Sequence, residues 1–232
     1  MMLEASYHNK QAMTSAGLER IAIPDADIEL WLARLDLDAN VVSQYANRLS
    51  TDERERARRF HFEHDRRRFA VARGTLRILL GEHLGIDPKL IKFTQTEKGK
   101  PSAIGTSIHF NVSHSHERVL IAISNNKPVG VDIEYLAREV DYAALAARYF
   151  TPNEYSMLRN LPETQRKRAF LVCWTCKEAV AKAIGEGLFA SFGKFEVAVL
   201  PGLTVAKQAN NHALHKMEVG DDYVAAVAAP AK

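Results

Sequence analysis

The chain has 232 residues, of which 47% are hydrophobic and 25% charged, and it carries a formal net charge of +3. This length and composition allow a sizeable core, arranged as one domain or two small ones. No apolar run reaches about 18 residues, which excludes a membrane-spanning helix. Residues 1–17 lack the apolar core of a signal peptide. We therefore expect a soluble globular protein of the cytoplasm without a membrane partner.

The first half of the chain is expected to combine strands with a long helix. Residues 27–35 are strand-like, and a helix is expected over 50–84. Ser50 is a plausible N-cap of this helix, Glu53 three residues later completes a capping box, and Gly85 ends it.

Three further strands complete this half. One is expected over 91–95, and two, over 108–112 and 119–124, are expected to pair across a polar turn at 113–118. The segment Asn125-Asn126-Lys127-Pro128 then interrupts the pattern. The chain therefore divides into residues 1–126 and residues 127–232.

The second half repeats this combination of strands and helices. A strand is expected over 129–134 and a helix over 142–149, and Thr151-Pro152 is typical of an N-cap followed by the first helical residue. A long helix over 163–184 ends at Gly185 and Gly187. The closing strands are expected at 195–200, 204–207, 215–219 and 223–228. Together these elements predict an α+β fold.

Four charged residues in two motifs carry the main chemical signal. Asp132 and Glu134 alternate on a strand, so their side chains leave the same face. Glu178 and Lys182 are one turn apart on a helix, which puts a third carboxylate beside an ammonium. Carboxylate oxygens suit Mg²⁺, and a lysine suits phosphate oxygens. These residues indicate metal-assisted phosphate chemistry.

The same two motifs, G-x-D-x-E and then W-x-x-K-E-A-x-x-K-A-x-G-x-G-L, resemble the 4'-phosphopantetheinyl transferases of the longer, surfactin-synthetase-activator type. Further blocks follow the family's order, at 50–60, 96–101 and 110–115, so the resemblance covers most of 50–188. Glu53 departs from the pattern, because several relatives carry a lysine there that helps to hold coenzyme A.

This resemblance implies a fold and an activity. It implies two similar α/β subdomains related by pseudo-twofold symmetry, with the active site in the cleft between them, in a monomer. The reaction would transfer 4'-phosphopantetheine from coenzyme A to a serine of an apo carrier protein, leaving adenosine 3',5'-bisphosphate. The carrier could belong to fatty acid, polyketide or nonribosomal peptide biosynthesis.

The resemblance also implies roles for particular residues. Mg²⁺ would be held by Asp132, Glu134 and Glu178, while Lys182 would assist the leaving group. Glu178 is also the first candidate for the general base, so metal ligation and base catalysis remain alternatives for it. Residues that would bind coenzyme A are Arg56, Arg68, Lys100, Pro101, Ser113 and His114.

Nine arginines between residues 54 and 77 favour an anionic partner. An equally consistent interpretation is a solvated helix with internal Glu–Arg pairs. A nucleic-acid-binding module would use the arginines but would give no reason for three acids to converge, so we expect no nucleic acid partner. Another Mg²⁺-dependent phosphotransferase would share the acids but has no use for the Gly-Lys-Pro and Ser-His-Ser blocks.

Cysteines and histidines suggest competing sites. Cys173 and Cys176 form a C-x-x-C, but no redox or zinc context surrounds them, so we expect reduced core residues of the long helix. His61 and His64 are expected on the surface, and no complete metal-ligand spacing is present among the histidines.

Overall fold

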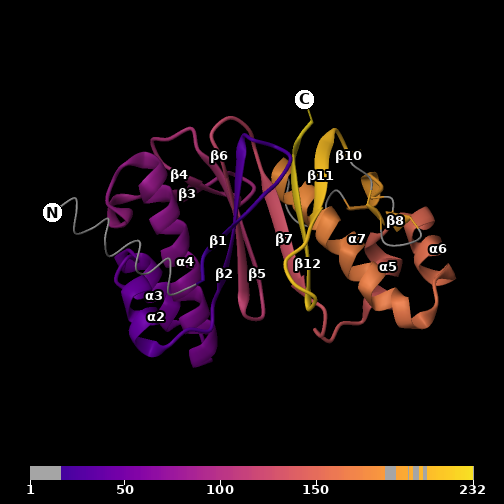
Figure 1. Ribbon diagram of the computed structural model, residues 1–232, viewed down its shortest axis with the longest axis horizontal. Coiled ribbons are helices and arrows are strands. Elements are labelled where there is room, and N and C mark those ends of the chain that lie inside the picture. Colours follow the sequence, from indigo (N-terminus) through magenta and orange to yellow (C-terminus); the bar gives the residue numbers. More distant parts are fainter. Residues whose placement is uncertain (1–16, 186–191, 198, 201–203, 206–207, 232) are drawn as a thin grey trace.

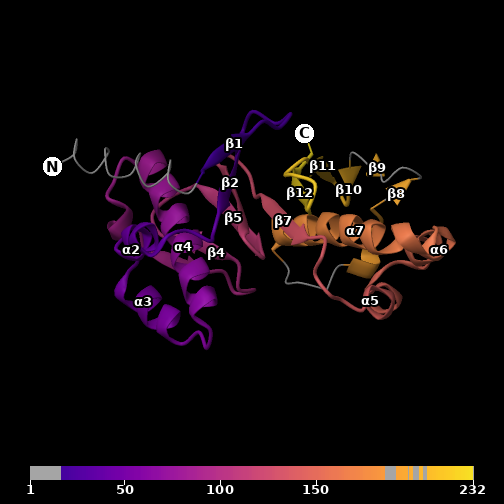
Figure 2. The same cartoon turned by 60° about the horizontal axis from the view of Figure 1, so that its bottom comes forward.

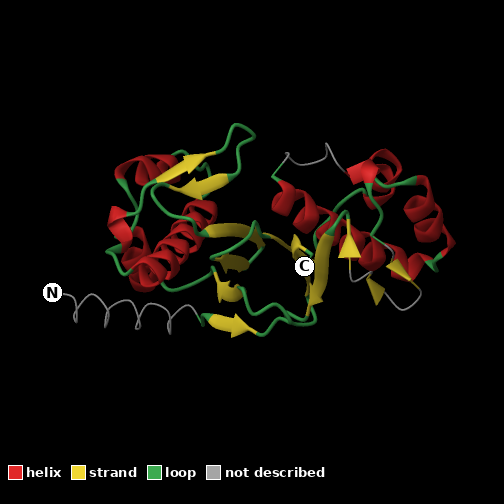
Figure 3. Ribbon diagram, turned by 90° about the horizontal axis from the view of Figure 1, so that it is seen from above, coloured by secondary structure: helices red, strands yellow, loops and turns green. Residues whose placement is uncertain are grey.

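The computed structural model describes residues 17–185, 192–197, 199–200, 204–205 and 208–231. Two sheets lie in the middle of the molecule, with helices at the two ends (Figures 1 and 3). The first sheet has the order β1-β2-β6-β5 and the second β10-β11-β12-β7, and all neighbouring pairs are antiparallel. The first sheet contains β1 (Glu19–Ile21), β2 (Ile28–Arg34), β5 (His109–Ser115) and β6 (Arg118–Ser124); the second contains β7 (Gly130–Tyr135), β10 (Gln208–Ala209), β11 (His212–Met217) and β12 (Tyr223–Pro230).

Each sheet packs against its own helices, and α4 and α7 are the long helix of each half (Figure 1). This repetition confirms the α+β fold with two similar halves. The first half contains α2 (Ala39–Ala46), α3 (Thr51–Arg58), α4 (Glu63–Leu84), η1 (Pro88–Leu90) and a hairpin of β3 (Phe93–Gln95) and β4 (Pro101–Ala103). The second half contains α5 (Tyr142–Tyr149), α6 (Pro152–Asn160), α7 (Glu163–Ile184), η2 (Phe192–Lys194), β8 (Val199–Leu200) and β9 (Thr204–Val205).

Apolar residues from both sheets join the two halves. Leu30 and Leu120 of the first sheet share a buried cluster with Val131 and Val227 of the second. Separate clusters fill the space between each sheet and its helices. Because alternate residues of a strand face opposite sides, Val131 and Ile133 point into the shared cluster, and Asp132 and Glu134 leave the other face of β7.

Gly130 lets β7 lie directly against α7, and the two elements run side by side (Figure 2). A Cβ atom at Gly130 would lie 2.1 Å from the backbone oxygen of Ala179 and 2.3 Å from the backbone nitrogen of Ala183. Real Cβ contacts are never this short, so only glycine fits. The glycine of G-x-D-x-E therefore sets how close the strand carboxylates come to the helix.

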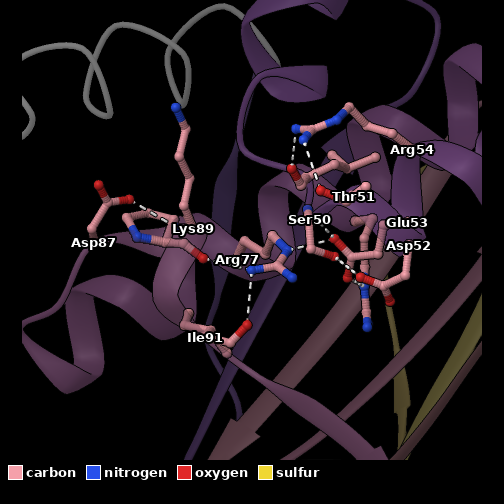
Figure 4. A network of polar contacts seen from close by, with 12 residues as sticks. Ser50, Thr51, Asp52, Glu53, Arg54, Arg77, Asp87, Lys89 and Ile91 are labelled. Atoms are coloured by element: carbon pink, nitrogen blue, oxygen red, sulfur yellow. Dashed lines mark hydrogen bonds and ion pairs between the residues drawn. The ribbon is translucent and has the colours of Figure 1, made fainter.

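The prediction of a single helix over 50–84 is wrong, because the segment forms two helices, α3 and α4. The break turns α3 back on α4, so that Glu53 accepts a hydrogen bond from Arg77 at 2.6 Å (Figure 4). On one continuous helix these residues would lie about 36 Å apart, at 1.5 Å per residue. The N-cap at Ser50 and its capping box with Glu53 are confirmed, as is the helix end at Gly85, which has φ of 65°.

The prediction of a turn over 113–118 is also wrong, because β5 continues to Ser115, which pairs with Arg118 of β6. His116, with φ of 51°, and Glu117 alone form the turn. The extension places Ser113, His114 and Ser115 within a strand, where alternate side chains share a face.

The remaining elements agree with the expectations in most cases. The helices over 142–149 and 163–184 have the expected bounds, and Thr151 forms a capping box before Pro152. The strands at 27–35, 91–95, 129–134, 215–219 and 223–228 are present with shifted ends. Residues 195–197 are not a strand, whereas β1, β4, β10 and α2 are not among the expected elements. The stop at Gly187 and parts of the strands at 195–200 and 204–207 lie outside the described residues.

Candidate active site

Asp132 of β7 is the centre of a cluster that joins three elements. Its Oδ1 atom accepts hydrogen bonds from Lys182 Nζ of α7 at 2.6 Å and from Ser113 Oγ of β5 at 2.7 Å. Lys182 Nζ also lies 3.2 Å from Ser113 Oγ. Asp132 is 3% exposed, so the strand carboxylate and the helix ammonium meet in a nearly closed position between the two halves.

Glu178 and Lys182 lie one turn apart on α7, and Glu178 Oε2 is 3.2 Å from Lys182 Nζ. The ammonium therefore bridges Asp132 and Glu178. Among the described residues, Lys182 is the cation that pairs with Glu178. Trp174, which the spacing puts on the same helix face, is buried in the core of the second half.

Glu134 is held by two side chains that its motif did not reveal. Ser115 Oγ donates to Glu134 Oε2 at 2.8 Å, and the guanidinium of Arg138 pairs with Glu134 Oε1. Arg138 follows Glu134 by four residues, just beyond the end of β7. The sequence signals that could have identified both partners are the two-residue period of Asn111, Ser113 and Ser115 and the cation four residues after the acid.

The pKa values of Glu178 and Glu134 are raised in this cluster. Burial and the nearby charge of Asp132 raise the pKa of Glu178 to about 7 and also raise the pKa of Glu134. Burial lowers the pKa of Lys182, but the charges of Asp132 and Glu178 outweigh this effect and the pKa is raised. The site therefore places three acidic side chains around one lysine, whose charged form Asp132 and Glu178 stabilise.

The donor chemistry of these residues fits a divalent cation with hard oxygen ligands. Asp132 Oδ2 is buried and has no hydrogen-bond partner in the described part of the chain, which is an uncommon state for a carboxylate oxygen. No three such side chains of the described residues form a ligand set in the present arrangement, and the Lys182 ammonium lies against two of the carboxylates. The unpartnered oxygen and the mutual repulsion are the features that a cation would relieve.

His114 and Arg68, both expected to bind phosphate, lie in the first half, and the charges of Lys182 and Arg68 both act on His114. Burial, followed by the charges of Lys182 and Arg68, lowers the pKa of His114. Arg68 forms a two-pronged ion pair with Asp36, with hydrogen bonds of 3.0 and 2.8 Å. The carboxylate fixes the plane of the guanidinium and leaves its remaining N–H groups for another anion.

Lys100 lies at the junction of the two halves. Its Nζ donates to the backbone oxygens of Val129 at 3.2 Å and Ala183 at 3.1 Å. A cavity of about 270 Å³ has both Lys100-Pro101 and Lys182 in its wall. One cavity is thus shared by Lys100 and Pro101 of the hairpin and by Lys182 of α7.

The position of Lys100 makes the stability of the protein depend on pH. Burial lowers the pKa of Lys100 to about 8, whereas an unfolded lysine has a pKa of about 10.4. Between these values the unfolded state binds more protons, so folding becomes more favourable as pH rises. After allowance for partial exposure, we expect the free energy of unfolding of wild type to rise by about 1–2 kcal/mol relative to that of Lys100→Met between pH 8 and 10.5.

Urea titrations of both proteins across that range measure this difference. The exposed Lys92 supplies a matched control. The free energy of unfolding of the Lys92→Met protein should differ from that of wild type by the same amount at every pH. A constant difference for Lys100→Met as well would contradict the effect of burial.

The arginines between residues 54 and 77 have different partners. Arg73 and Arg77 are paired with Glu53, and Arg67 donates to the backbone oxygen of Leu37. Arg56, expected to bind coenzyme A, lies over the ring of Phe69 at 5.3 Å, and no described hydrogen bond joins it to the carboxylate cluster. Some of these arginines are therefore structural, and others are available to an anion.

The cysteine pair is structural, as expected. Cys173 and Cys176 are free thiols, 3% and 1% exposed. Burial raises the pKa of both thiols, which keeps them protonated and unreactive. His61 and His64 are exposed, as expected for surface residues.

Comparison with known proteins assigns the chain to a family. Two family models match adjoining segments: "4'-phosphopantetheinyl transferase, N-terminal" over residues 38–126 and "4'-phosphopantetheinyl transferase superfamily" over residues 128–228. The 4'-phosphopantetheinyl transferase HetI of a Nostoc species is 39% identical over 208 residues, which cover 87% of each chain. The chain belongs to the 4'-phosphopantetheinyl transferase family.

Other members of the family are similar over a shorter span. The 4'-phosphopantetheinyl transferase Sfp of Bacillus subtilis is 31% identical over 150 residues, 64% of this chain and 66% of its own. The transferase gsp of Aneurinibacillus migulanus is 34% identical over 160 residues, 69% of this chain and 66% of its own. None of the described helices of the present transferase is both long and apolar enough to cross a membrane.

Proposed function

We propose that this chain transfers 4'-phosphopantetheine from coenzyme A to a serine hydroxyl of an apo acyl or peptidyl carrier protein, releasing adenosine 3',5'-bisphosphate. Family membership supports this activity. The observation that carries it is the meeting of Asp132 with Glu178 and Lys182 next to Ser113 of the other half. Coenzyme A and the carrier protein are the partners that the reaction requires.

Asp132, Glu134 and Glu178 would hold Mg²⁺. Their oxygens are the ligands that this ion prefers, and the unpartnered Oδ2 of Asp132 supports the assignment. When bound, Mg²⁺ would neutralise the diphosphate of coenzyme A and stabilise negative charge on its oxygens.

Lys182 is suited to assist the leaving group. Its charge is maintained by Asp132 and Glu178, and it borders the cavity that leads to Lys100 and Pro101. An ammonium in this position can donate a hydrogen bond to the diphosphate oxygen on which charge accumulates as the bond to phosphorus breaks.

Glu178 is the candidate general base. The serine of the carrier must lose a proton as it attacks phosphorus, and the acceptor must be within hydrogen-bond reach. Asp132 and Glu134 are each held by a serine of β5, whereas Glu178 pairs with Lys182 of its own helix. Glu178 would accept the proton directly or through one water.

The first half would bind coenzyme A. We assign its phosphates to Arg56, Arg68, Ser113 and His114, and its adenine side to the Lys100-Pro101 loop. The two-pronged pair with Asp36 supports Arg68 because it holds the guanidinium in one plane. The cavity between Lys182 and the loop supports a path for the diphosphate. The division into 1–126 and 127–232 then separates coenzyme A binding from the carboxylates and α7.

Replacement of Arg56 by alanine tests the coenzyme A site. A contact made equally in the ground state and the transition state changes KM with little change in kcat, so we expect the KM for coenzyme A to rise about tenfold while kcat stays within about threefold. Steady-state kinetics at saturating carrier protein measure both. The neighbouring Arg58→Ala protein is the control, and a large fall in kcat with unchanged KM would contradict the assignment.

We also propose that the protein is a monomer in the cytoplasm. The two halves share one buried apolar cluster within a single chain, so the cleft is complete without a second copy. Two buried free thiols suit a reducing compartment.

A further inference from the structure

The junction between the two sheets is made by side chains of β5. β5 pairs with β6 and β7 pairs with β12, so β5 and β7 are the facing edges of two separate sheets. Three alternate residues of β5, Asn111, Ser113 and Ser115, cross the gap, and we call them the β5 seam. Side-chain atoms therefore take the place of a backbone ladder between the halves.

Each residue of the β5 seam has a different partner on β7. Asn111 Oδ1 accepts from the backbone N–H of Val131 at 2.9 Å, and Ser113 donates to Asp132. Ser115 does both, because its Oγ accepts from the backbone N–H of Tyr135 at 3.0 Å and donates to Glu134 Oε2 at 2.8 Å. Only the two serines touch carboxylates.

The double contact fixes the Ser115 hydroxyl. A hydroxyl has one hydrogen, and the N–H of Tyr135 points at the oxygen, so the hydrogen is directed to Glu134. The other partner of Glu134 is Arg138, whose side chain is 50% exposed, whereas the Glu134 side chain is 10% exposed. A long, half-exposed arginine holds a carboxylate less firmly than a short serine anchored to a strand. Ser115 is therefore the rigid support of Glu134.

We propose that Ser115 is a positioning residue, which holds the Glu134 carboxylate in the orientation that binds a divalent cation beside Asp132. This inference deepens the proposed function and rests on its divalent cation. Partners of this kind, which orient a ligand without touching the metal, typically change metal affinity by 10–100-fold when they are removed. The support comes from the first half of the chain, although Glu134 belongs to the second.

Titration of the protein with Mn²⁺, without coenzyme A or carrier, tests the role directly. Free Mn²⁺ is measured by electron paramagnetic resonance for wild type and for Ser115→Ala, Ser115→Thr and Asn111→Ala. We expect Ser115→Ala to bind Mn²⁺ 10–100-fold more weakly and Ser115→Thr, which keeps the hydroxyl, to bind within about threefold of wild type.

Asn111→Ala is the matched control for the seam itself. It removes a side-chain acceptor from a backbone N–H of β7, as Ser115→Ala does, but no carboxylate loses a partner. Both variants should lower the unfolding temperature, whereas only Ser115→Ala should lower Mn²⁺ affinity. This difference separates positioning from a structural role.

Two results would overturn the inference in distinguishable ways. Unchanged Mn²⁺ affinity in Ser115→Ala, or an equal loss in Asn111→Ala, would remove the positioning role and leave the proposed function intact. Wild-type protein that binds no Mn²⁺ would remove the cation and with it the role of Ser115. A carrier modification assay on the same preparation would then show whether the transferase activity itself survives.

Discussion

Replacement of Asp132 by asparagine should lower kcat/KM for transfer by at least about a thousandfold, equivalent to about 4 kcal/mol of transition-state stabilisation. Asparagine keeps the shape of the side chain and can still accept from Ser113. It removes the negative charge that bonds Lys182 at 2.6 Å and that would hold the cation through the unpartnered Oδ2. The loss should therefore come from the chemistry of the site and leave the core unchanged.

Circular dichroism and urea unfolding must show that the Asp132→Asn protein is folded. Asp221→Asn is the matched control because Asp221 is exposed in the turn before β12, and it should retain wild-type activity. Near-normal turnover of Asp132→Asn in Mg²⁺ would contradict the role that we give this carboxylate.

Glu53→Ala is expected to have the largest effect on stability. The Glu53 side chain is 6% exposed and pairs with Arg73 and Arg77, and the Arg77 guanidinium also donates to the backbone oxygens of Pro88 and Ile91 (Figure 4). Removal of one partner leaves buried cations without a counter-charge, which typically costs about 3–5 kcal/mol. Urea titration at pH 7 measures the change in free energy of unfolding.

Glu55→Ala on the same helix is the control, since Glu55 is exposed and should change stability by less than about 0.5 kcal/mol. A loss below about 1 kcal/mol for Glu53→Ala would show that the pair is not a structural anchor. A lysine at this position would face the two arginines Arg73 and Arg77.

The site motifs could be predicted from sequence because each one depends on local geometry. The strand period puts Asp132 and Glu134 on one face, and the helix period puts Glu178 beside Lys182. The bounds of α7 followed from its composition and from Gly185, which ends the helix with φ of 76°. Resemblance to a family then connected two motifs that lie about 40 residues apart.

Contacts between distant residues could not be predicted. The break between α3 and α4 is stabilised by Glu53 and Arg77, 24 positions apart, and propensity alone favoured a continuous helix. The polarity of Ser113, His114 and Ser115 suggested a turn, whereas the two serine side chains hydrogen-bond carboxylates on β7. In both cases the partner that decides the local structure lies elsewhere in the chain.

Transfer of the phosphopantetheine arm to a carrier protein is the activity on which the proposed function depends. Intact-protein mass spectrometry of a panel of apo carrier proteins, incubated with wild-type protein, coenzyme A and Mg²⁺, measures it, with EDTA and Asp132→Asn as controls. We predict that at least one carrier gains the mass of one phosphopantetheine arm and that both controls abolish the gain. A carrier modified equally well in EDTA would contradict the role of the metal, and the absence of both modification and coenzyme A binding would contradict the proposed function.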